Sequence, residues 1–138
     1  MDYEKFIEYR NSTNPFARYV GVKVTKVAEG YAEGEVIIRP ELLNPVGYVH
    51  GGCLYTMADV VTGAASAALG TDAVTVSGEY HYLAAAKDTE KVSVVSKCIK
   101  KGKTLLTFDV EVFDDKKKLI GKGTFTSYRL YNVPIVVE

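Results

Sequence analysis

Residues 44–59 read Asn-Pro-Val-Gly-Tyr-Val-His-Gly-Gly-Cys-Leu-Tyr-Thr-Met-Ala-Asp. The stretch begins with a turn-forming Asn44-Pro45 pair and leads into an apolar segment that continues to residue 70. Asp59 is the only charged side chain between Gly51 and Gly70. A carboxylate alone on an apolar helix is either hydrogen-bonded inside the core or used in chemistry.

The residues around this segment predict the fold. Gly51 to Leu69 lacks a polar face and favours a helix that must be enclosed. A hairpin is expected before it, with a first strand from Val22 and a returning strand over Tyr31 to Arg39. Four β-rich segments follow the helix: Ala73 to Leu83, Lys91 to Lys100, Thr104 to Phe113 and Leu119 to Leu130. We therefore predict an α+β fold, with a curved antiparallel sheet wrapped around one long central helix.

A short amphipathic helix is expected at the N-terminus. Tyr3, Phe6, Ile7 and Arg10 share one helical face within residues 2–11, and the helix should end before Asn14-Pro15. We expect this helix to pack on the larger unit.

Composition limits the classes of protein and partner. A chain of 138 residues with 47% hydrophobic residues suits one domain over residues 1–138. Basic and acidic residues both total 17, which gives no overall field for nucleic acid. The first residues lack a signal-peptide pattern and the long helix carries Asp59, so we expect a cytoplasmic protein without a membrane span. Cys53, Cys98, His50 and His81 lack metal-ligand spacing, so no metal site is expected.

A single curved sheet leaves edge strands that need a partner. Pairing two edges across a two-fold axis covers them, so we expect a homodimer or a dimer of dimers.

The start of the long helix has the features of an oxyanion site. The backbone N–H groups of Gly51 and Gly52 have no partner within the helix, and they lie at the positive end of its dipole. Asp59 follows Gly51 by eight residues, which is about 12 Å along a helix. One carbonyl cannot easily contact both groups in one subunit. A site shared between two subunits removes this difficulty.

These residues together resemble a known family. The matching positions are Asn44, Gly47, His50-Gly51-Gly52, Asp59, Tyr82-Leu83, Lys101-Gly102-Lys103 and the strand Leu119 to Thr126. The pattern is similar to the hotdog-fold acyl-CoA thioesterases, most closely to the phenylacetic-acid-degradation type that includes thioesterase superfamily member 2. The resemblance covers residues 14–130 and implies the hotdog fold.

The resemblance also implies roles for individual residues. The N–H of Gly51 would bind the thioester oxygen, with the Asn44 side chain assisting. Asp59 would act as general base on water or as the nucleophile, and the choice between these stays open. Gly52 and Tyr82 are expected beside the substrate. No metal or organic cofactor is implied, because coenzyme A enters as part of the acyl-CoA substrate.

Relatives place a Ser or Thr after the helix to orient the attacking water. Counting back from Tyr82 selects Thr75, whereas counting forward from Asp59 selects Ser77. Both residues should lie on the same strand face because they are two apart. We favour Thr75 and keep Ser77 as the alternative.

Simpler interpretations stand beside several of these roles. Asn44 could serve only as a turn former, and His50 either braces the helix start or contacts substrate. Lys101-Gly102-Lys103 would meet the phosphates of coenzyme A, or form only a solvated turn. Lys87 and Lys91 are expected near the same rim.

The sequence therefore predicts an acyl-CoA thioesterase. A non-catalytic acyl-CoA sensor is the alternative, although such a sensor would not need Asp59. A hotdog dehydratase fits the sequence less well. Such an enzyme needs a histidine that abstracts a proton, whereas His50 precedes a Gly-Gly pair.

Overall fold

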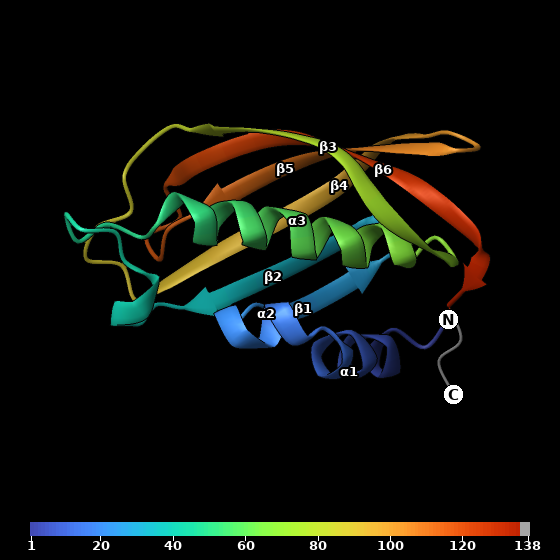
Figure 1. Cartoon of the computed structure of the whole chain (residues 1–138), viewed down its shortest axis with the longest axis horizontal. Helices are drawn as coiled ribbons and strands as arrows, with labels where there is room; N and C mark the ends of the chain where they lie inside the picture. The colour runs from blue at the N-terminus through green and yellow to red at the C-terminus, as the bar shows by residue number, and fades with distance from the viewer. Residues whose placement is uncertain (136–138) are drawn as a thin grey trace.

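The computed structural model describes residues 1–135 and contains a six-stranded antiparallel sheet curved around one long helix, α3 (Gly51–Ala67) (Figure 1). The strands are β1 (Lys23–Ala28), β2 (Tyr31–Ile37), β3 (Thr71–Tyr82), β4 (Lys91–Lys101), β5 (Leu105–Phe113) and β6 (Leu119–Pro134), in spatial order β1-β2-β4-β5-β6-β3. The other helices are α1 (Tyr3–Thr13), α2 (Pro15–Val20) and a 3₁₀ turn at Pro40–Leu42. No helix within residues 1–135 has the length and hydropathy to cross a bilayer. The predicted α+β class and the enclosed central helix are confirmed.

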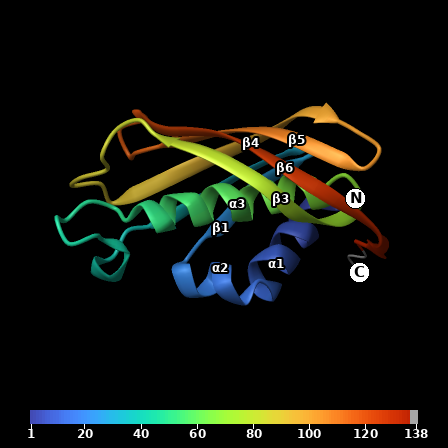
Figure 2. The ribbon, with the colours of Figure 1, turned by 45° about the horizontal axis from the view of Figure 1, so that its top comes forward.

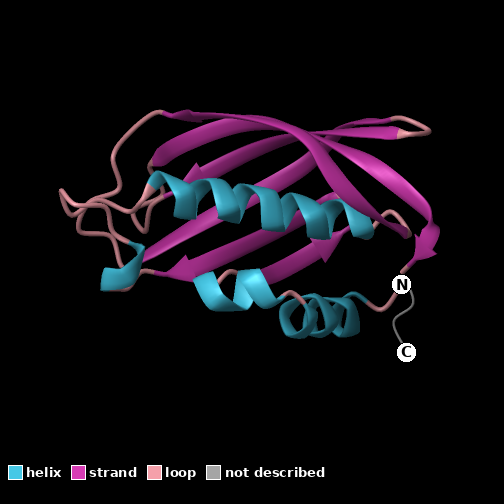
Figure 3. Cartoon of the chain, in the orientation of Figure 1, coloured by secondary structure: helices cyan, strands magenta, loops and turns pink. Residues whose placement is uncertain are grey.

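The helices of residues 1–135 lie on one side of the sheet, and α3 packs directly against it (Figures 2 and 3). The core contains α3 residues such as Met57 and sheet residues such as Phe108 and Phe125, all fully buried. Two buried hydroxyl contacts join α3 to the sheet. Thr62 Oγ1 lies 2.9 Å from Ser96 Oγ, and the Ser66 hydroxyl donates to Ser127 Oγ at 3.3 Å. These contacts help to fix the rotation of α3 about its axis, which leaves Asp59 half-buried at the margin of the core.

The N-terminal region contains one helix more than expected. α1 ends at Thr13, as predicted from Asn14-Pro15. The chain then starts α2 at Pro15, with the Asn14 side chain accepting a hydrogen bond from Ala17 N at 3.1 Å. Asn at the N-cap followed by Pro at the first helical position is a helix-start signal. The sequence pattern had been interpreted only as the end of the first helix, and the start of a second helix at Pro15 was missed.

The two edges of the sheet differ in whether they can pair with a further strand. At the β1 edge, the Asn11 amide donates to Val24 O at 3.0 Å, and its oxygen accepts from Val24 N at 2.9 Å. This side chain replaces a strand partner and blocks further pairing there. At the other edge, β3 runs for 12 residues with no strand beyond it in the described chain. Val74 and Val76 on β3 are each about half exposed. The β3 edge therefore remains open to a partner.

Candidate functional site

The start of α3 leaves one backbone donor free. His50 is the N-cap residue, and its Nδ1 accepts a hydrogen bond from Gly52 N at 2.8 Å. The N–H of Gly51 donates to no other described residue, so it remains available for a ligand. The two glycines therefore differ. The Gly52 N–H is hydrogen-bonded to His50, whereas the Gly51 N–H is free and is the candidate oxyanion donor. His50 therefore braces the helix start, which is one of the two positions expected for it.

Asn44 shapes the loop that leads to this helix. Its side-chain oxygen accepts hydrogen bonds from Val46 N at 3.1 Å and Tyr48 N at 3.0 Å. Gly47 completes the turn with a φ of +86°, a conformation that favours glycine. The turn-forming interpretation of Asn44 therefore holds for its oxygen. The amide N–H donors remain free of these contacts and can still serve a ligand.

Tyr82 covers the start of α3 from strand β3. Its hydroxyl donates to Gly51 O at 3.0 Å, and a Cβ on Gly51 would lie 3.0–3.2 Å from its ring and hydroxyl. Asn44, Gly51 and Tyr82 line one open pocket of about 360 Å³. Its other walls are mainly apolar and are formed by Tyr48, Val49, Leu54, Leu83, Ala84, Ala85 and Ala86. The pocket offers an apolar surface beside the free Gly51 donor.

Asp59 and Thr75 form a second centre. The Thr75 hydroxyl donates to Asp59 Oδ1 at 2.6 Å, which joins α3 to β3. Neither residue lines the Gly51 pocket. Eight helical positions, about 12 Å along the axis, separate Gly51 from Asp59. One chain therefore presents a donor centre and a carboxylate centre at separate places on the same helix.

The expectation that Thr75 and Ser77 share a strand face is wrong. Thr75 pairs with Ser127 and Ser77 with Thr126, so β3 advances two residues while β6 advances one. This β-bulge interrupts the alternation of side chains. Ser77 consequently shares the outer face with Glu79 and His81, whereas Thr75 contacts α3. Only Thr75 contacts Asp59.

The basic hairpin lies at the opposite end of the molecule from Gly51. Lys101 ends β4, and its ammonium is 3.8 Å from the carboxylate of Glu29 in the β1–β2 turn. Figure 1 shows the β4–β5 turn at the right and the start of α3 at the left. A Cβ on Gly102 would overlap Leu105 O, so the tight turn itself requires glycine.

The expectation that Lys87 and Lys91 lie near this hairpin is wrong. Lys91 begins β4 and pairs with Ile37, so the length of the whole strand separates it from Lys101. Lys87 Nζ lies 6.0 Å from the ring centroid of Tyr48, beside the Gly51 pocket. Lys87, which lies beside the Gly51 pocket, was therefore predicted at the wrong end of the sheet.

Three tyrosines occupy the space between these two centres. Tyr80 packs against Tyr82 and Tyr55, with ring centroids 4.6 and 6.4 Å apart. Burial raises the pKa of Tyr80, and the Tyr82 charge adds to the effect. The pKa of Tyr55 is also raised, mainly by burial and to a smaller extent by the negative charge of Asp59. Burial therefore favours the protonated forms of Tyr80 and Tyr55. The Tyr80 hydroxyl is buried and has no hydrogen-bond partner within the described residues.

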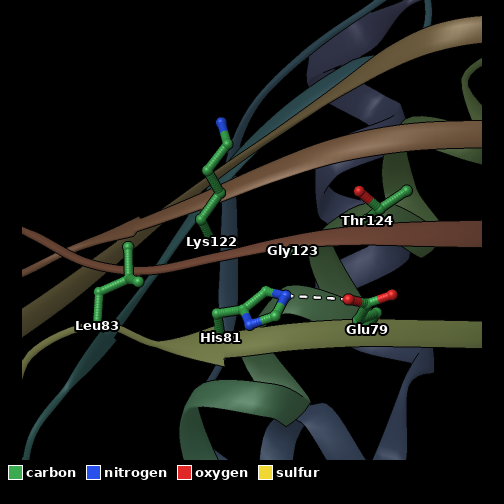
Figure 4. A pocket seen from close by; sticks show the side chains of 6 residues that line it. All are labelled: Glu79, His81, Leu83, Lys122, Gly123 and Thr124. Carbon is green, nitrogen blue, oxygen red and sulfur yellow. Dashed lines mark hydrogen bonds and ion pairs between the residues drawn. The ribbon is translucent and has the colours of Figure 1, made fainter.

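A separate hollow of about 240 Å³ lies on the outer face of the sheet (Figure 4). It is lined by Glu79, His81, Leu83, Lys122, Gly123 and Thr124. His81 Nε2 lies 3.0 Å from Glu79 Oε1. The hollow contains none of the residues expected to be catalytic. Among residues 1–135, no three His, Cys, Asp or Glu side chains gather closely enough to hold a metal ion.

Comparison with known proteins identifies the family of this chain. Residues 46–120, which include both centres, match the profile of the thioesterase superfamily. This chain belongs to the thioesterase superfamily. Human acyl-coenzyme A thioesterase 13 is 28% identical over 117 residues, covering 82% of this chain and 84% of that protein.

Solved structures agree with the family assignment. The PaaI protein from the phenylacetic acid degradation operon of E. coli has a TM-score of 0.89 at 20% identity, covering 97% of this chain and 99% of the other. This structural similarity confirms that the chain has the hotdog fold. The smu.793 protein of Streptococcus mutans, solved bound to acetyl-CoA, has a TM-score of 0.76 at 27% identity, covering 80% of this chain and 89% of the other.

Proposed function

We propose that this chain is an acyl-CoA thioesterase that hydrolyses a thioester to a free carboxylic acid and coenzyme A. The observation that carries the proposal is that one helix presents both a free Gly51 N–H and an Asp59 carboxylate held by Thr75. A fixed backbone donor stabilises the charge that develops on the thioester oxygen. A carboxylate placed by a neighbouring hydroxyl acts as base on water or attacks the acyl carbon.

The complete site forms between two subunits. Pairing of two β3 edges across a two-fold axis makes the strands antiparallel, and the two copies of α3 then also run antiparallel. The Gly51 end of one helix thereby approaches the Asp59 half of the other. The half-exposed Val74 and Val76 side chains on the open edge support this pairing.

The same two-fold arrangement accounts for the position of the basic hairpin. The β4–β5 turn lies at the far end of its own α3, and an antiparallel α3 of the partner would bring its Gly51 toward that end. In the dimer, we assign Lys101-Gly102-Lys103 of one subunit to the phosphates of the coenzyme A bound at the other. Asn44 contributes its amide N–H groups beside Gly51, and His50 keeps the helix start in place.

Thiol release from a panel of aliphatic and aromatic acyl-CoAs tests the proposal. Thioesterase activity predicts that at least one class releases thiol with saturating kinetics and with equimolar free acid. A purified, folded protein that binds acyl-CoA but releases no thiol from any substrate would instead be a sensor. The panel also gives the acyl preference of the enzyme.

Replacing Thr75 separates the two candidate water-orienting residues. Thr75→Ala removes the hydroxyl that holds Asp59, and we expect a fall in kcat of about tenfold or more. Ser77→Ala is the matched control, because this hydroxyl lies on the outer face of β3, and kcat should stay within about twofold of wild type. Steady-state kinetics on one acyl-CoA measures both variants. A larger loss in Ser77→Ala than in Thr75→Ala would reverse the assignment.

A further inference from the structure

Tyr82 holds the residue that carries the free backbone donor. Its hydroxyl donates to Gly51 O at 3.0 Å, and this is the only side-chain hydrogen bond to Gly51 among residues 1–135. A Cβ on Gly51 would lie 3.0–3.2 Å from the Tyr82 ring and hydroxyl, so the ring packs directly against the glycine. The Gly51 N–H itself stays free. The contact therefore restrains Gly51 without occupying its donor.

Two adjacent glycines make the start of α3 easy to deform. Glycine has more accessible backbone conformations than other residues, and the first helical turn lacks part of its hydrogen bonds. His50 restrains Gly52 through the 2.8 Å hydrogen bond from its N–H. Tyr82 restrains Gly51 at its carbonyl. A backbone donor stabilises an oxyanion best when its direction is fixed before the charge develops. The bond from Tyr82 therefore bears on the chemical step.

Tyr82 is itself held firmly on the sheet. It is the last residue of β3 and pairs with Gly121 of β6. The next two residues both donate backbone hydrogen bonds to Ile120 O, at 2.9 and 3.2 Å. Tyr80 packs edge-on against the Tyr82 ring, with centroids 4.6 Å apart. These contacts anchor the phenol beside the pocket that Gly51 lines.

We propose that Tyr82 is a positioning residue, whose hydroxyl keeps the Gly51 N–H directed at the thioester oxygen during hydrolysis. The inference rests on the proposed thioesterase function. When the nucleophile adds to the acyl carbon, an electron pair of the C=O bond moves to the oxygen, and the Gly51 N–H binds the charge that forms there. The C–S bond then breaks. Overall one water is consumed: its hydroxyl stays on the acyl carbon, and its other proton goes to the coenzyme A thiolate.

Tyr82→Phe removes the hydroxyl and keeps the ring. We expect kcat to fall about five- to tenfold while KM stays within about twofold of wild type, because a misdirected donor weakens binding of the transition state alone. A trifluoromethyl ketone analogue of acyl-CoA is hydrated in water and resembles the tetrahedral intermediate, so its affinity should fall by the same factor. The affinity for a thioether analogue, which lacks this oxygen, should not change. Steady-state thiol release and calorimetry measure these quantities.

Two neighbouring tyrosines give matched controls. The Tyr55 hydroxyl also joins α3 to β3, donating to Gly78 O at 3.1 Å, but it does not contact Gly51. Tyr55→Phe should lower Tm at least as much as Tyr82→Phe does, and keep kcat within about twofold of wild type. The buried Tyr80 hydroxyl has no partner within the described residues, so Tyr80→Phe should keep kcat and keep or raise Tm.

Equal kcat in wild type and Tyr82→Phe overturns the role of Tyr82. A rise in KM at unchanged kcat also overturns it, because the hydroxyl would then contact the substrate itself. The same holds for an equal loss of kcat in Tyr55→Phe, since any weakened contact between α3 and β3 would then suffice. A wild-type protein that releases no thiol from any acyl-CoA would instead refute the thioesterase proposal, on which the role depends.

Discussion

Asp59→Asn is expected to lower kcat by about 10²–10⁴-fold while acyl-CoA still binds. Asparagine has nearly the shape of aspartate and can still accept the Thr75 hydrogen bond at its amide oxygen. It cannot take a proton from water, and it is a poor nucleophile. The chemical step should therefore fail while the fold and the ligand pocket persist. Thiol release measures turnover, and calorimetry with a non-hydrolysable acyl-CoA thioether measures binding.

Asp109→Asn is the matched control for this experiment. Asp109 is also partly exposed, but it belongs to β5 and lies 3.2 Å from Lys122 Nζ. It lies away from α3, on the outer face of the sheet, and its variant should keep kcat within about twofold of wild type. If Asp59→Asn retained full turnover, the carboxylate would be structural. If it lost acyl-CoA binding together with turnover, Asp59 would belong to the binding surface instead.

Local sequence signals were sufficient for the main architecture. The apolar run after Gly51 indicated an enclosed helix, and α3 extends from Gly51 to Ala67. Alternation within 104–113 indicated a strand with one buried face, and its buried side, including Phe108 and Val110, packs into the core. These signals are periodic and local, so they could be interpreted without knowledge of distant contacts.

Features that depend on pairing between distant residues could not be predicted in the same way. The bulge between Thr75 and Ser77 exists only in register with β6. A count along the chain assumes strict alternation and cannot detect such a bulge. The position of Lys91 depends on which end of β4 meets the helix start, which is a matter of topology. Proximity in sequence had suggested a single basic rim.

For the candidate site, the sequence indicated individual residues but not the contacts between them. Gly51, Asp59 and Thr75 were named from the sequence, yet the contact of Thr75 with Asp59 depends on the register of β3 against α3.

Gly51→Pro is expected to lower kcat by about 10²–10³-fold, because it removes the backbone N–H proposed to bind the oxyanion. Proline is well tolerated at the first position of a helix, where the N–H has no helical partner. His50 already has an extended backbone, with φ −60° and ψ 135°, as the residue before a proline requires. Circular dichroism and Tm should therefore remain close to wild type, and steady-state thiol release measures the loss.

Gly51→Ala is the control for the added side-chain atoms. Its Cβ would press on the same Tyr82 ring, 3.0 Å away, but the N–H remains. Tyr82 is 56% exposed and can move. We expect Gly51→Ala to lose less than about tenfold in kcat. An equal loss in both variants would mean that the Tyr82 contact matters, rather than the N–H donor.

Mixing Gly51→Pro with Asp59→Asn distinguishes a shared site from a site within one chain. In a homodimer with shared sites, each variant alone leaves every site without one component. After unfolding and refolding together at equal amounts, about half of the dimers contain one chain of each kind. In each mixed dimer, one site combines an intact Gly51 N–H with an intact Asp59, so about a quarter of the wild-type activity should return. A site within one chain regains nothing on mixing, and a protein that sediments as a monomer cannot form the shared site. Recovery near a quarter would therefore assign Gly51 and Asp59 to opposite subunits, in agreement with the shared site proposed from their separation of about 12 Å along one helix.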